Sequence, residues 1–584
     1  MAASPAAPAL RFADTTLSYA ELDRRANRLA HHLRALGVQA ETWVGLCLPR
    51  GLEIAVAVLA VLRAGGGFVP LDPDYPVERL DTMARHAGLR VLVHDGASPL
   101  DDAVADHVVD LRQAPPDAYP DTDPGVVSHP DHAAYLIFTS GSSGVPKGVV
   151  LSHRGINTLA EGQRELFAID AHSRILQYAA LSFDAMVSEL VTALGLGACL
   201  VLADAQALLP GPALAALLAA EAITHLTLPP SSLALLPARP LPALRCLVVA
   251  GETCPAALVA RWAPGRRFVN AYGPTEATVC ASGAVLAAGG PVTIGRPLPG
   301  VRLYVLDRHG EPLPPGLPGE LHIGGPGLAR GYLGDPARSA AAFVPDPFDH
   351  TPGARLYRSG DRVRWTHEGE LEFLGRLDRQ VKLRGFRIEP GEVQARLARH
   401  PAVAASAVVV REDPPAPAML VAYVVSHGEP PGAAALREYL ARALPDYMLP
   451  GRVVYLDELP RTPAGKLDRR RLPAPDTDDR QPYQAPDTDT ERLLASLWEE
   501  ILGVRQVGLD DDFFELGGHS LLALRLITRL REQFQVEIPL PTLFQQPRLR
   551  EQAIAVENAQ FAASGEDELG ALLDQIQGLD EPGE

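Results

Sequence analysis

The stretch Tyr135–Gly148, YLIFTSGSSGVPKG, decides how the rest of the chain is interpreted. Its first four residues, Tyr135–Phe138, are a short apolar run that predicts a buried strand. The glycines and hydroxyl side chains that follow can bring backbone N–H groups and O–H donors close to an anion. Lys147 adds a positive charge, and the stretch does not match the Walker pattern GxxxxGK[ST]. It therefore predicts a loop that grips a polyphosphate, with a flexible Ser/Gly linker as the weaker alternative.

Length, charge and cysteine usage set the class of protein. The 584 residues suggest about four structural units. The net charge of -18 at pH 7 disfavours a nucleic-acid partner, and with it an aminoacyl-tRNA synthetase. The five cysteines are scattered without a CxxC pair, which is typical of reduced thiols in a cytoplasmic protein. We find neither a signal-peptide pattern nor an apolar run of about 18 residues, so no membrane partner is expected.

The first half of the chain alternates between strand and helix patterns. Trp43–Leu48 predicts a strand, Gly51–Ala64 a helix and Phe68–Leu71 a further strand. This alternation predicts an α/β fold with a mostly parallel sheet. Gln177–Phe183 is interpreted as a strand that ends at Asp184. Because ligands bind beyond the carboxyl ends of such strands, we expect the site there.

The sequence pattern changes after about residue 290. Short predicted strands separated by Gly/Pro turns indicate a β-rich subdomain there. A charged junction and a small α+β lobe follow, then an Asp/Pro-rich linker and an amphipathic helical unit. The expected division is a core over residues 1–377, a C-terminal lobe over 378–474, a linker over 475–488, an all-α four-helix unit over 489–556 and an acidic tail over 557–584.

A set of motifs in a fixed order carries a specific resemblance. The set is LSYAEL, LRAGGGFVPLDP, TSGSSGVPKG, NAYGPTEATVC, GELHIGGPGLARGYL, YRSGD, GRLDRQVKLRGFRIEPGEV, LPDYMLP and AGKLDR. Together they resemble the adenylation domain of a nonribosomal peptide synthetase, a member of the adenylate-forming superfamily. The later LGGHS unit resembles a peptidyl carrier protein. The resemblance implies a large adenylate-forming core, a small mobile C-terminal lobe and a helical carrier bundle.

The same resemblance implies a nucleotide site. It assigns the β- and γ-phosphates of ATP to Lys147 and the loop residues Thr139, Ser140, Gly141, Ser142, Ser143 and Gly144. It assigns the nucleoside to Asn270, Tyr272, Gly273, Thr275, Asp361, Phe373 and Arg376, with Tyr272 stacking on adenine and Asp361 accepting the ribose hydroxyls. Glu276 would bind Mg²⁺, a hard cation that prefers carboxylate and phosphate oxygens.

Two further residues would carry the chemistry. Lys466 would bridge the substrate carboxylate and the α-phosphate, which makes it the third catalytic residue with Glu276 and Lys147. Ser520 of LGGHS would carry 4′-phosphopantetheine, added by a phosphopantetheinyl transferase. Asp378 falls at the family's hinge, and a swing of the lobe would exchange Lys466 for the Lys382–Glu389 region.

The resemblance also assigns the family's amino-acid pocket to residues of this sequence, through the motifs that contain them. Its residues are Asp184, Ala185, Ser188, Thr227, Val248, Ala250, Ala271, Val279, Cys280 and Lys466. Asp184 would pair with the substrate ammonium, and the other side walls are small or apolar. The set is similar to phenylalanine-activating pockets, except that Ser188 stands where an aromatic residue is common. Serine frees volume and supplies a hydroxyl, so the prediction is L-tyrosine, with L-phenylalanine as runner-up.

The chain shows neither the HHxxxDG condensation signature nor a GxSxG thioesterase elbow after the carrier. We therefore expect a free-standing adenylation–carrier pair of secondary metabolism that presents its amino acid to a tailoring oxygenase in antibiotic biosynthesis. An MbtH-like protein is a further candidate partner. The alternatives are an acyl- or aryl-CoA ligase, which Asp184 and the carrier disfavour, a decayed scaffold, and an amino-acid reductase or initiation module, for which we find no dinucleotide-binding domain after the carrier. Intact Lys147, Glu276, Asp361 and Lys466 disfavour decay.

Overall fold

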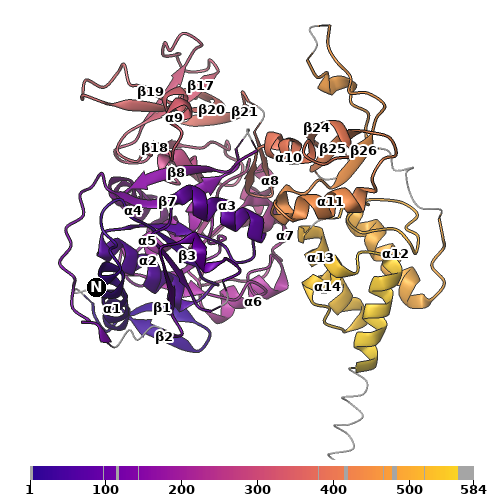
Figure 1. Ribbon diagram of the computed structural model, residues 1–584, viewed down its shortest axis with the longest axis horizontal. Coiled ribbons are helices and arrows are strands. Elements are labelled where there is room, and N and C mark those ends of the chain that lie inside the picture. The colour runs from indigo at the N-terminus through magenta and orange to yellow at the C-terminus, as the bar shows by residue number, and fades with distance from the viewer. Residues whose placement is uncertain are drawn as a thin grey trace, which may run out of the picture. The chain divides into compact units, whose positions relative to one another are not determined.

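The computed structural model describes residues 4–562, except 97, 114–117, 142–143, 379, 413–417, 464–465, 476–482 and 519. The chain divides into two compact units, which Figure 1 shows in indigo to salmon and in orange to yellow. The first consists of Met1–Leu209, Ala213–Val393 and Leu440–Asp446; the second consists of Pro210–Pro212, Gln394–Tyr439 and Tyr447–Glu584. The fold is mixed α/β, as predicted.

A seven-stranded sheet in the first unit carries the phosphate loop. Its order is β18 (Gly331–Tyr332), β8 (Lys147–Ser152), β7 (Ala133–Thr139), β4 (Gly67–Pro70), β3 (Trp43–Cys47), β5 (Val91–His94) and β6 (His107–Asp110). The apolar run Tyr135–Phe138 lies inside β7, which confirms the predicted strand. The β7 and β8 strands are antiparallel, and Thr139 is paired with Lys147, so the two ends of the loop are fixed beside each other.

A nine-stranded sheet holds the amino-acid side of the site. Its order is β15 (Arg296–Pro297), β14 (Ser282–Leu286), β13 (Arg267–Tyr272), β12 (Cys246–Val249), β11 (His225–Leu228), β9 (Arg174–Leu176), β10 (Cys199–Leu202), β1 (Pro8–Phe12) and β2 (Thr15–Ser18). The β11, β12 and β13 strands are parallel neighbours, so their carboxyl ends lie at one edge. Short strands of apolar and β-branched residues, buried on both faces, are typical of such sheets.

The helices of the first unit follow their sequence signals. They are α1 (Tyr19–Ala35), α2 (Leu52–Ala64), α3 (Val77–Ala87), α4 (His153–Phe167), α5 (Asp184–Leu194), α6 (Pro212–Ala220), α7 (Pro230–Leu235), α8 (Ala256–Trp262) and α9 (Pro336–Ala342), with single 3-10 turns at Asp102–Val104 and Thr275–Ala277. The next helix, α10 (Pro390–Leu397), contains the division between the two units, which falls after Val393. Ser18 and Glu21 form a capping box that begins α1. Gly65, left-handed at φ 90°, ends α2. Most of α2 is buried, in keeping with its nearly all-apolar sequence.

The predicted strand Gln177–Phe183 is wrong: β9 ends at Leu176 and the segment forms a loop that leads into α5. Side chains satisfy the backbone of this loop, so it needs no ladder of strand hydrogen bonds. Arg50 donates to the carbonyl oxygens of Tyr178 and Ala179, at 3.2 and 2.7 Å. The carboxylate of Glu189 accepts from both of their N–H groups at 3.1 Å. Side-chain hydrogen bonds therefore stabilise this short apolar segment as a loop rather than as a strand.

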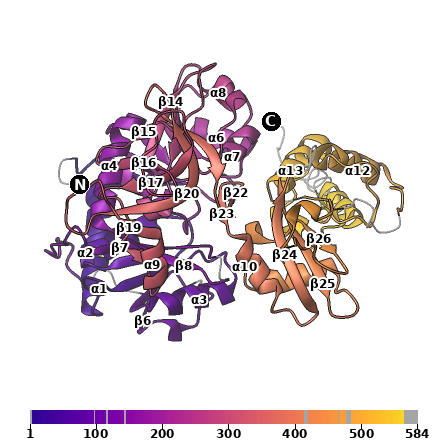
Figure 2. The ribbon, with the colours of Figure 1, turned by 90° about the horizontal axis from the view of Figure 1, so that it is seen from above.

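The β-rich subdomain predicted after residue 290 is a five-stranded antiparallel sheet. It contains β16 (Arg302–Leu306), β17 (Gly319–Gly324), β20 (Arg355–Trp365) and β19 (Phe343–Pro345), with β21 (Leu371–Arg376) paired to β20. A hairpin of β22 (Val381–Leu383) and β23 (Phe386–Ile388) follows and lies beside α7 (Figure 2). The hairpin turn at Gly385 approaches Pro229 so closely that an added Cβ would lie 2.5 Å from its Cγ.

The second unit contains a small sheet and a helical bundle. The sheet consists of β24 (Val403–Arg411), β25 (Met419–Ser426) and β26 (Arg452–Tyr455), accompanied by α11 (Ala433–Ala441) and 3-10 turns at Asp446–Met448 and Arg469–Arg471. The bundle comprises α12 (Asp489–Leu502), α13 (Ser520–Phe534), α14 (Leu540–Gln545) and a helix over residues 549–562. Its core is built around Trp498 and Phe513, whose rings meet edge to face with centroids 5.1 Å apart.

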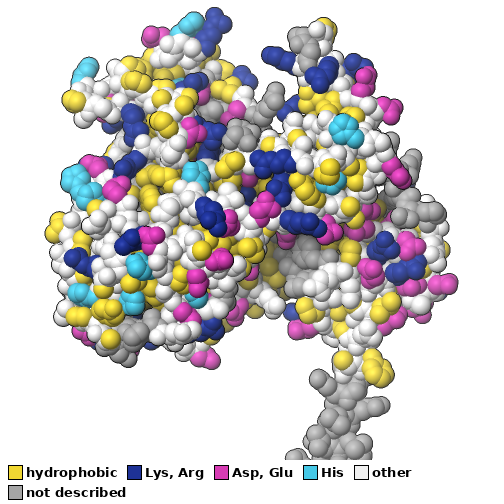
Figure 3. Space-filling view, in the orientation of Figure 1, with side chains coloured by type: hydrophobic (Ala, Val, Ile, Leu, Met, Phe, Trp, Pro, Cys, Tyr) yellow, Lys and Arg dark blue, Asp and Glu magenta, His cyan; other side chains and the backbone are white. Residues whose placement is uncertain are grey.

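Two surface properties bear on the class of protein. Within residues 4–562, as far as they are described, no helix has the length and apolar character needed to cross a membrane. On the face shown in Figure 3, acidic and basic side chains are interspersed. The acidic tail predicted over 557–584 lies beyond the described residues from 563 onward.

Candidate active site

The phosphate loop and Glu276 meet in the first unit. Lys147, the first residue of β8, places its Nζ 3.2 Å from Oε1 of Glu276, which lies in the 3-10 turn after β13. The hydroxyl of Tyr332 donates to the same carboxylate oxygen at 2.8 Å. The Lys147 ammonium also lies 4.9 Å from the centre of the Tyr332 ring, a cation–π distance. The sequence motifs therefore bring a cation and a carboxylate together as expected for a phosphate site.

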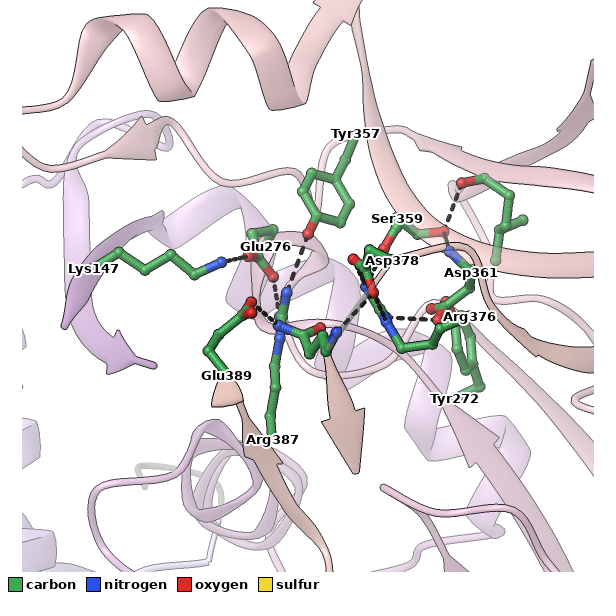
Figure 4. Close-up of polar contacts among 12 residues, drawn as sticks. Lys147, Tyr272, Glu276, Tyr357, Ser359, Asp361, Arg376, Asp378, Arg387 and Glu389 are labelled. Atoms are coloured by element: carbon green, nitrogen blue, oxygen red, sulfur yellow. Dashed lines mark hydrogen bonds and ion pairs between the residues drawn. The ribbon is translucent and has the colours of Figure 1, made fainter. Parts of the chain in front are cut away.

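A second cation, which the sequence analysis did not single out, binds the other side of Glu276. The guanidinium of Arg387, on β23, donates to Oε2 of Glu276 at 2.6 Å, so both cations point at one carboxylate (Figure 4). Burial alone would raise the pKa of Glu276, but Arg387 and Lys147 outweigh it and hold that pKa well below its usual range. Glu276 is therefore ionised although its side chain is completely buried.

The segment after Arg387 occupies donors of the phosphate loop. The Ser140 hydroxyl donates to the backbone carbonyl of Arg387 at 2.9 Å. The N–H of Gly141 donates to Oε2 of Glu392 at 3.0 Å, and Arg79 donates to Oε1 of the same carboxylate at 2.9 Å. Glu392 is only 2% exposed. A carboxylate of the chain itself thus lies where an anionic ligand would bind.

Other loop groups remain available. The buried hydroxyl of Thr139 has no hydrogen-bond partner among the described residues, which is uncommon for a buried polar atom. An orphaned donor in this loop fits a ligand that supplies anionic oxygens. Gly144 adopts φ 84°, a left-handed conformation that favours glycine. Ser142 and Ser143, also predicted as phosphate ligands, lie outside the described residues.

The predicted nucleoside residues gather around Asp361. Arg376 donates to Oδ1 of Asp361 at 2.6 Å and to Oδ1 of Asp378 at 2.6 Å, so it links the ribose residue to the predicted hinge (Figure 4). The Tyr272 hydroxyl donates to the other oxygen of Asp361. The Tyr272 and Phe373 ring centroids are 6.4 Å apart.

Three more predicted nucleoside residues have defined partners. Asn270 is buried and its side-chain amide donates to the carbonyl oxygen of Thr293 at 2.7 Å. Thr275 is buried in the 3-10 turn after β13, and its side chain contributes to lowering the pKa of Asp184 against the effect of burial. Gly273 has no room for a side chain, since a Cβ would lie 2.4 Å from the carbonyl oxygen of Val279.

Nine of the ten predicted amino-acid pocket residues, all except Lys466, lie on α5, at the ends of adjacent strands or in the turn after β13. Asp184 begins α5 and Ser188 follows one turn later, so both lie on the same helix face. The remaining walls come from the ends of adjacent strands and the turn after β13: Thr227, Val248, Ala250, Ala271, Val279 and Cys280. Val279 has φ 67°, a strained value for a β-branched residue. Burial raises the pKa of Asp184, and within the described part of the chain it forms no ion pair.

The two remaining predicted residues lie in the second unit. Lys466 is exposed, in a turn closed by a 2.7 Å hydrogen bond from the N–H of Thr462 to its carbonyl oxygen. Ser520 is the first residue of α13. The turn before it is tight, because a Cβ on Gly518 would lie 2.3 Å from Cδ1 of Phe513.

A metal site is supported only through Glu276. Among the described residues there is no cluster of three or more His, Cys, Asp or Glu side chains that could hold a metal ion. The ionised carboxylate of Glu276 is a suitable hard ligand, but both of its oxygens are bound by cations or hydroxyls in this structure. A metal would therefore need Arg387 to leave.

The fold and site define an AMP-binding enzyme joined to a carrier. Residues 1–333, more than half of the chain, match the family described as AMP-binding enzyme, and residues 392–466 match its C-terminal domain. Residues 492–556 match the phosphopantetheine attachment site. The chain belongs to the AMP-binding enzyme family. It has the makeup of an adenylation–carrier module of a nonribosomal peptide synthetase, a class that activates amino acids with ATP and loads them on a phosphopantetheine arm.

Individual relatives agree with this class. A linear gramicidin synthase polypeptide of Brevibacillus parabrevis is 44% identical over 573 residues, which is 97% of this chain and 11% of that protein. Phosphinothricin tripeptide synthetase PhsC of Streptomyces viridochromogenes is 45% identical over 92% of this chain and 50% of its own length. The chain thus spans half or less of these relatives. The structure of holo-PA1221, an NRPS protein with adenylation and PCP domains bound to a vinylsulfonamide inhibitor, matches with a TM-score of 0.80 and 29% identity over 96% of this chain and 95% of that one.

Proposed function

We propose that this chain activates L-tyrosine as tyrosyl-AMP with ATP and transfers the tyrosyl group to an arm on its own Ser520. The observation that carries the proposal is Asp184, a buried carboxyl group that forms no ion pair among the described residues and heads a pocket of small and apolar side chains. Such a group suits a substrate ammonium. L-phenylalanine is the second candidate, because the predicted pocket walls are mostly apolar. Only Ser188 and Thr227 among the predicted wall residues carry a hydroxyl group.

The first half-reaction follows from the charges. The substrate carboxylate attacks the α-phosphorus of ATP, and pyrophosphate leaves, so positioning and charge stabilisation supply most of the catalysis. Lys147, the Gly141 N–H and the orphaned Thr139 hydroxyl would bind the β- and γ-phosphates. Lys466 would lie between the two reacting anions, and Glu276 would bind Mg²⁺ once Arg387 withdraws.

The second half-reaction suits the arrangement seen here. With Arg387 on Glu276 and Glu392 on the phosphate loop, the chain's own groups occupy the positions proposed for Mg²⁺ and pyrophosphate. This state would follow release of pyrophosphate. Ser520 would hold a phosphopantetheine arm, whose thiol would take the tyrosyl group from tyrosyl-AMP with release of AMP and of the thiol proton. Gly385 would leave a narrow passage for the arm beside Pro229, where a side chain would not fit.

An acyl- or aryl-CoA ligase remains the alternative. The chain resembles the solved structure of o-succinylbenzoate CoA synthetase from Bacillus subtilis with a TM-score of 0.71 at 24% identity, which establishes the shared fold alone. Asp184 favours an amino acid over an aryl acid, and the attachment domain at 492–556 favours a tethered thiol over free CoA.

The organisation and partners are part of the same proposal. We propose the division expected from the sequence: a core over 1–377, a mobile lobe over 378–474 hinged at Asp378, a linker over 475–488 and a carrier over 489–556. A phosphopantetheinyl transferase would modify Ser520. An MbtH-like protein and a tailoring oxygenase acting on the tethered tyrosine are further proposed partners. Equal turnover of free and tethered tyrosine by candidate oxygenases would argue against the last of these.

Pyrophosphate exchange tests the substrate directly. The full chain is assayed with each of the twenty amino acids, with and without an MbtH-like protein. We expect the fastest exchange with L-tyrosine and the next with L-phenylalanine. Highest exchange with a charged or small amino acid, or none with any, would refute the proposal.

Intact-mass measurement tests the attachment site. After treatment with CoA and a phosphopantetheinyl transferase, the wild type should gain one phosphopantetheine, then one tyrosyl group in the presence of ATP and tyrosine. Ser520→Ala should gain neither and should retain pyrophosphate exchange. Ser496→Ala, which alters another serine of the carrier, should behave as the wild type; a mass gain in Ser520→Ala would assign the arm elsewhere.

A further inference from the structure

The hydroxyl of Ser188 already has a partner inside the protein. Ser188 Oγ donates to Oε1 of Gln163 at 2.7 Å. Gln163 lies on α4, is 2% exposed and belongs to none of the motifs that identified the pocket. A hydroxyl has one hydrogen and two lone pairs, so Ser188 has only lone pairs left for a ligand.

The thiol hydrogen of Cys280, another predicted wall residue, is also engaged inside the protein. The thiol of Cys280 donates to the carbonyl oxygen of Ser282, with 3.4 Å between sulfur and oxygen, so its sulfur can only accept. Burial raises the pKa of Cys280 to about 12, so the thiol keeps its hydrogen. The hydroxyl hydrogen of Ser188 is engaged by the amide oxygen of Gln163, and the thiol hydrogen of Cys280 is engaged by the carbonyl oxygen of Ser282.

We propose that Gln163 is a positioning residue that makes Ser188 an obligate hydrogen-bond acceptor, and that the pocket therefore selects a ring whose far end carries a hydrogen-bond donor. The inference rests on the proposed activation of an aromatic amino acid. Ser188 is 8% exposed against 2% for Gln163, so Ser188 is the group that a substrate can reach. The phenol O–H of tyrosine satisfies a lone pair of Ser188, whereas phenylalanine leaves it unpaired and costs binding free energy.

A size-matched set of substrates tests this polarity without any mutation. Pyrophosphate exchange is measured with L-tyrosine, 4-amino-L-phenylalanine, 4-fluoro-L-phenylalanine and L-phenylalanine. The hydroxyl and amino groups can donate, whereas fluorine cannot. The wild type should prefer both donors over the fluoro compound by about tenfold or more in kcat/KM, the scale of one buried hydrogen bond. Equal use of tyrosine and 4-fluoro-phenylalanine would overturn the proposal.

A pair of variants then tests Gln163 itself. Gln163→Met keeps the length of the side chain but removes both polar groups, so the Ser188 hydroxyl can turn. The preference for tyrosine over 4-fluoro-phenylalanine should fall about fivefold to tenfold. Gln163→Glu keeps an oxygen acceptor opposite Ser188 and should retain the preference. Ser188→Ala should lose it, and adding Gln163→Met to Ser188→Ala should lower it no further.

The outcomes separate this proposal from the proposed function. If tyrosine is activated but Gln163→Met leaves the preference unchanged while the protein melts as the wild type does, the role of Gln163 is refuted and tyrosine activation stands. If a non-aromatic amino acid is the substrate, both the proposed tyrosine activation and the proposed role of Gln163 are refuted. A preference that is lost equally in Gln163→Met and Gln163→Glu would also contradict the polarity argument, because only one of them removes the acceptor.

Discussion

The nucleotide side and the amino-acid side of this site satisfy their charges in opposite ways. On the nucleotide side, Glu276 is bound by Lys147 and Arg387, and Glu392 lies on the phosphate loop with Arg79. These charges already have partners within the chain. On the proposed amino-acid side, Asp184 is buried at the start of α5 and forms no ion pair among the described residues.

The difference shows what each side must do before reaction. A buried carboxylate that forms no ion pair is costly, and an incoming ammonium would relieve that cost. In the proposed reaction, the nucleotide side exchanges its internal ion pairs for Mg²⁺ and phosphate. The proposal therefore requires two arrangements of one site, which would differ in the 385–392 segment.

The largest effect is expected from breaking the amino-acid side. Asp184→Ala removes the partner of the substrate ammonium and should lower kcat/KM for tyrosine by on the order of 10²- to 10³-fold, as for truncation of one member of a buried charge pair. The KM for MgATP should change little. Kinetics of pyrophosphate exchange give both values, and Asp204→Ala, at an exposed position, is the control. If tyrosine activation by Asp184→Ala stays within about threefold of the wild type, Asp184 does not bind the substrate ammonium.

A smaller effect is expected from loosening the nucleotide side. Arg387→Met removes the cation that competes with Mg²⁺ for Glu276, so the KM for MgATP in pyrophosphate exchange should fall. Loading of Ser520, followed by rapid quench and intact mass, should slow about tenfold because the post-adenylation arrangement is lost. Arg362→Met changes an exposed arginine and should alter neither value. A raised KM for MgATP with normal loading would place Arg387 in the first half-reaction instead.

The smallest effect is a pH dependence that only the amino-acid side should show. Burial raises the pKa of Asp184, so this acid takes up its proton at a higher pH than an exposed aspartate does. Its attraction for the ammonium is present when it is ionised and is lost as pH falls through the raised value. The pKa of Glu276 is shifted the opposite way, so it stays ionised. From mildly alkaline to mildly acidic buffer, the KM for tyrosine should rise several-fold and the KM for MgATP less; equal changes would contradict the assignment.

The sequence was sufficient for the parts of the site that motifs encode. The apolar run predicted β7, and Arg376 was expected beside Asp361. Lys147 and Glu276 both belong to recognised motifs, but their direct contact was not predicted. The Lys382–Glu389 region was expected near the site only after a swing, and the structure places it there. The sequence did not identify Arg387 as the partner of Glu276, because any of several basic residues in that charged stretch could have filled this role.

Two other features could not be obtained from patterns. Gln177–Phe183 has the composition of a strand, yet the side chains of Arg50 and Glu189, which lie outside this segment, satisfy its backbone as a loop. Gln163 lies on a helix with no motif around it. Its effect on Ser188 depends on a side-chain contact across 25 positions, and a helical pattern shows only that Gln163 is buried.

The central claim is that one site performs two half-reactions with different residues, and a crossed measurement on two variants tests it most directly. Lys466→Ala should make tyrosyl-AMP slowly but load Ser520 at a normal rate when synthetic tyrosyl-AMP is supplied. Gly385→Val, whose side chain would collide with Pro229, should make tyrosyl-AMP normally but load slowly. If instead both variants slow both half-reactions by the same factor, the two-arrangement account is contradicted.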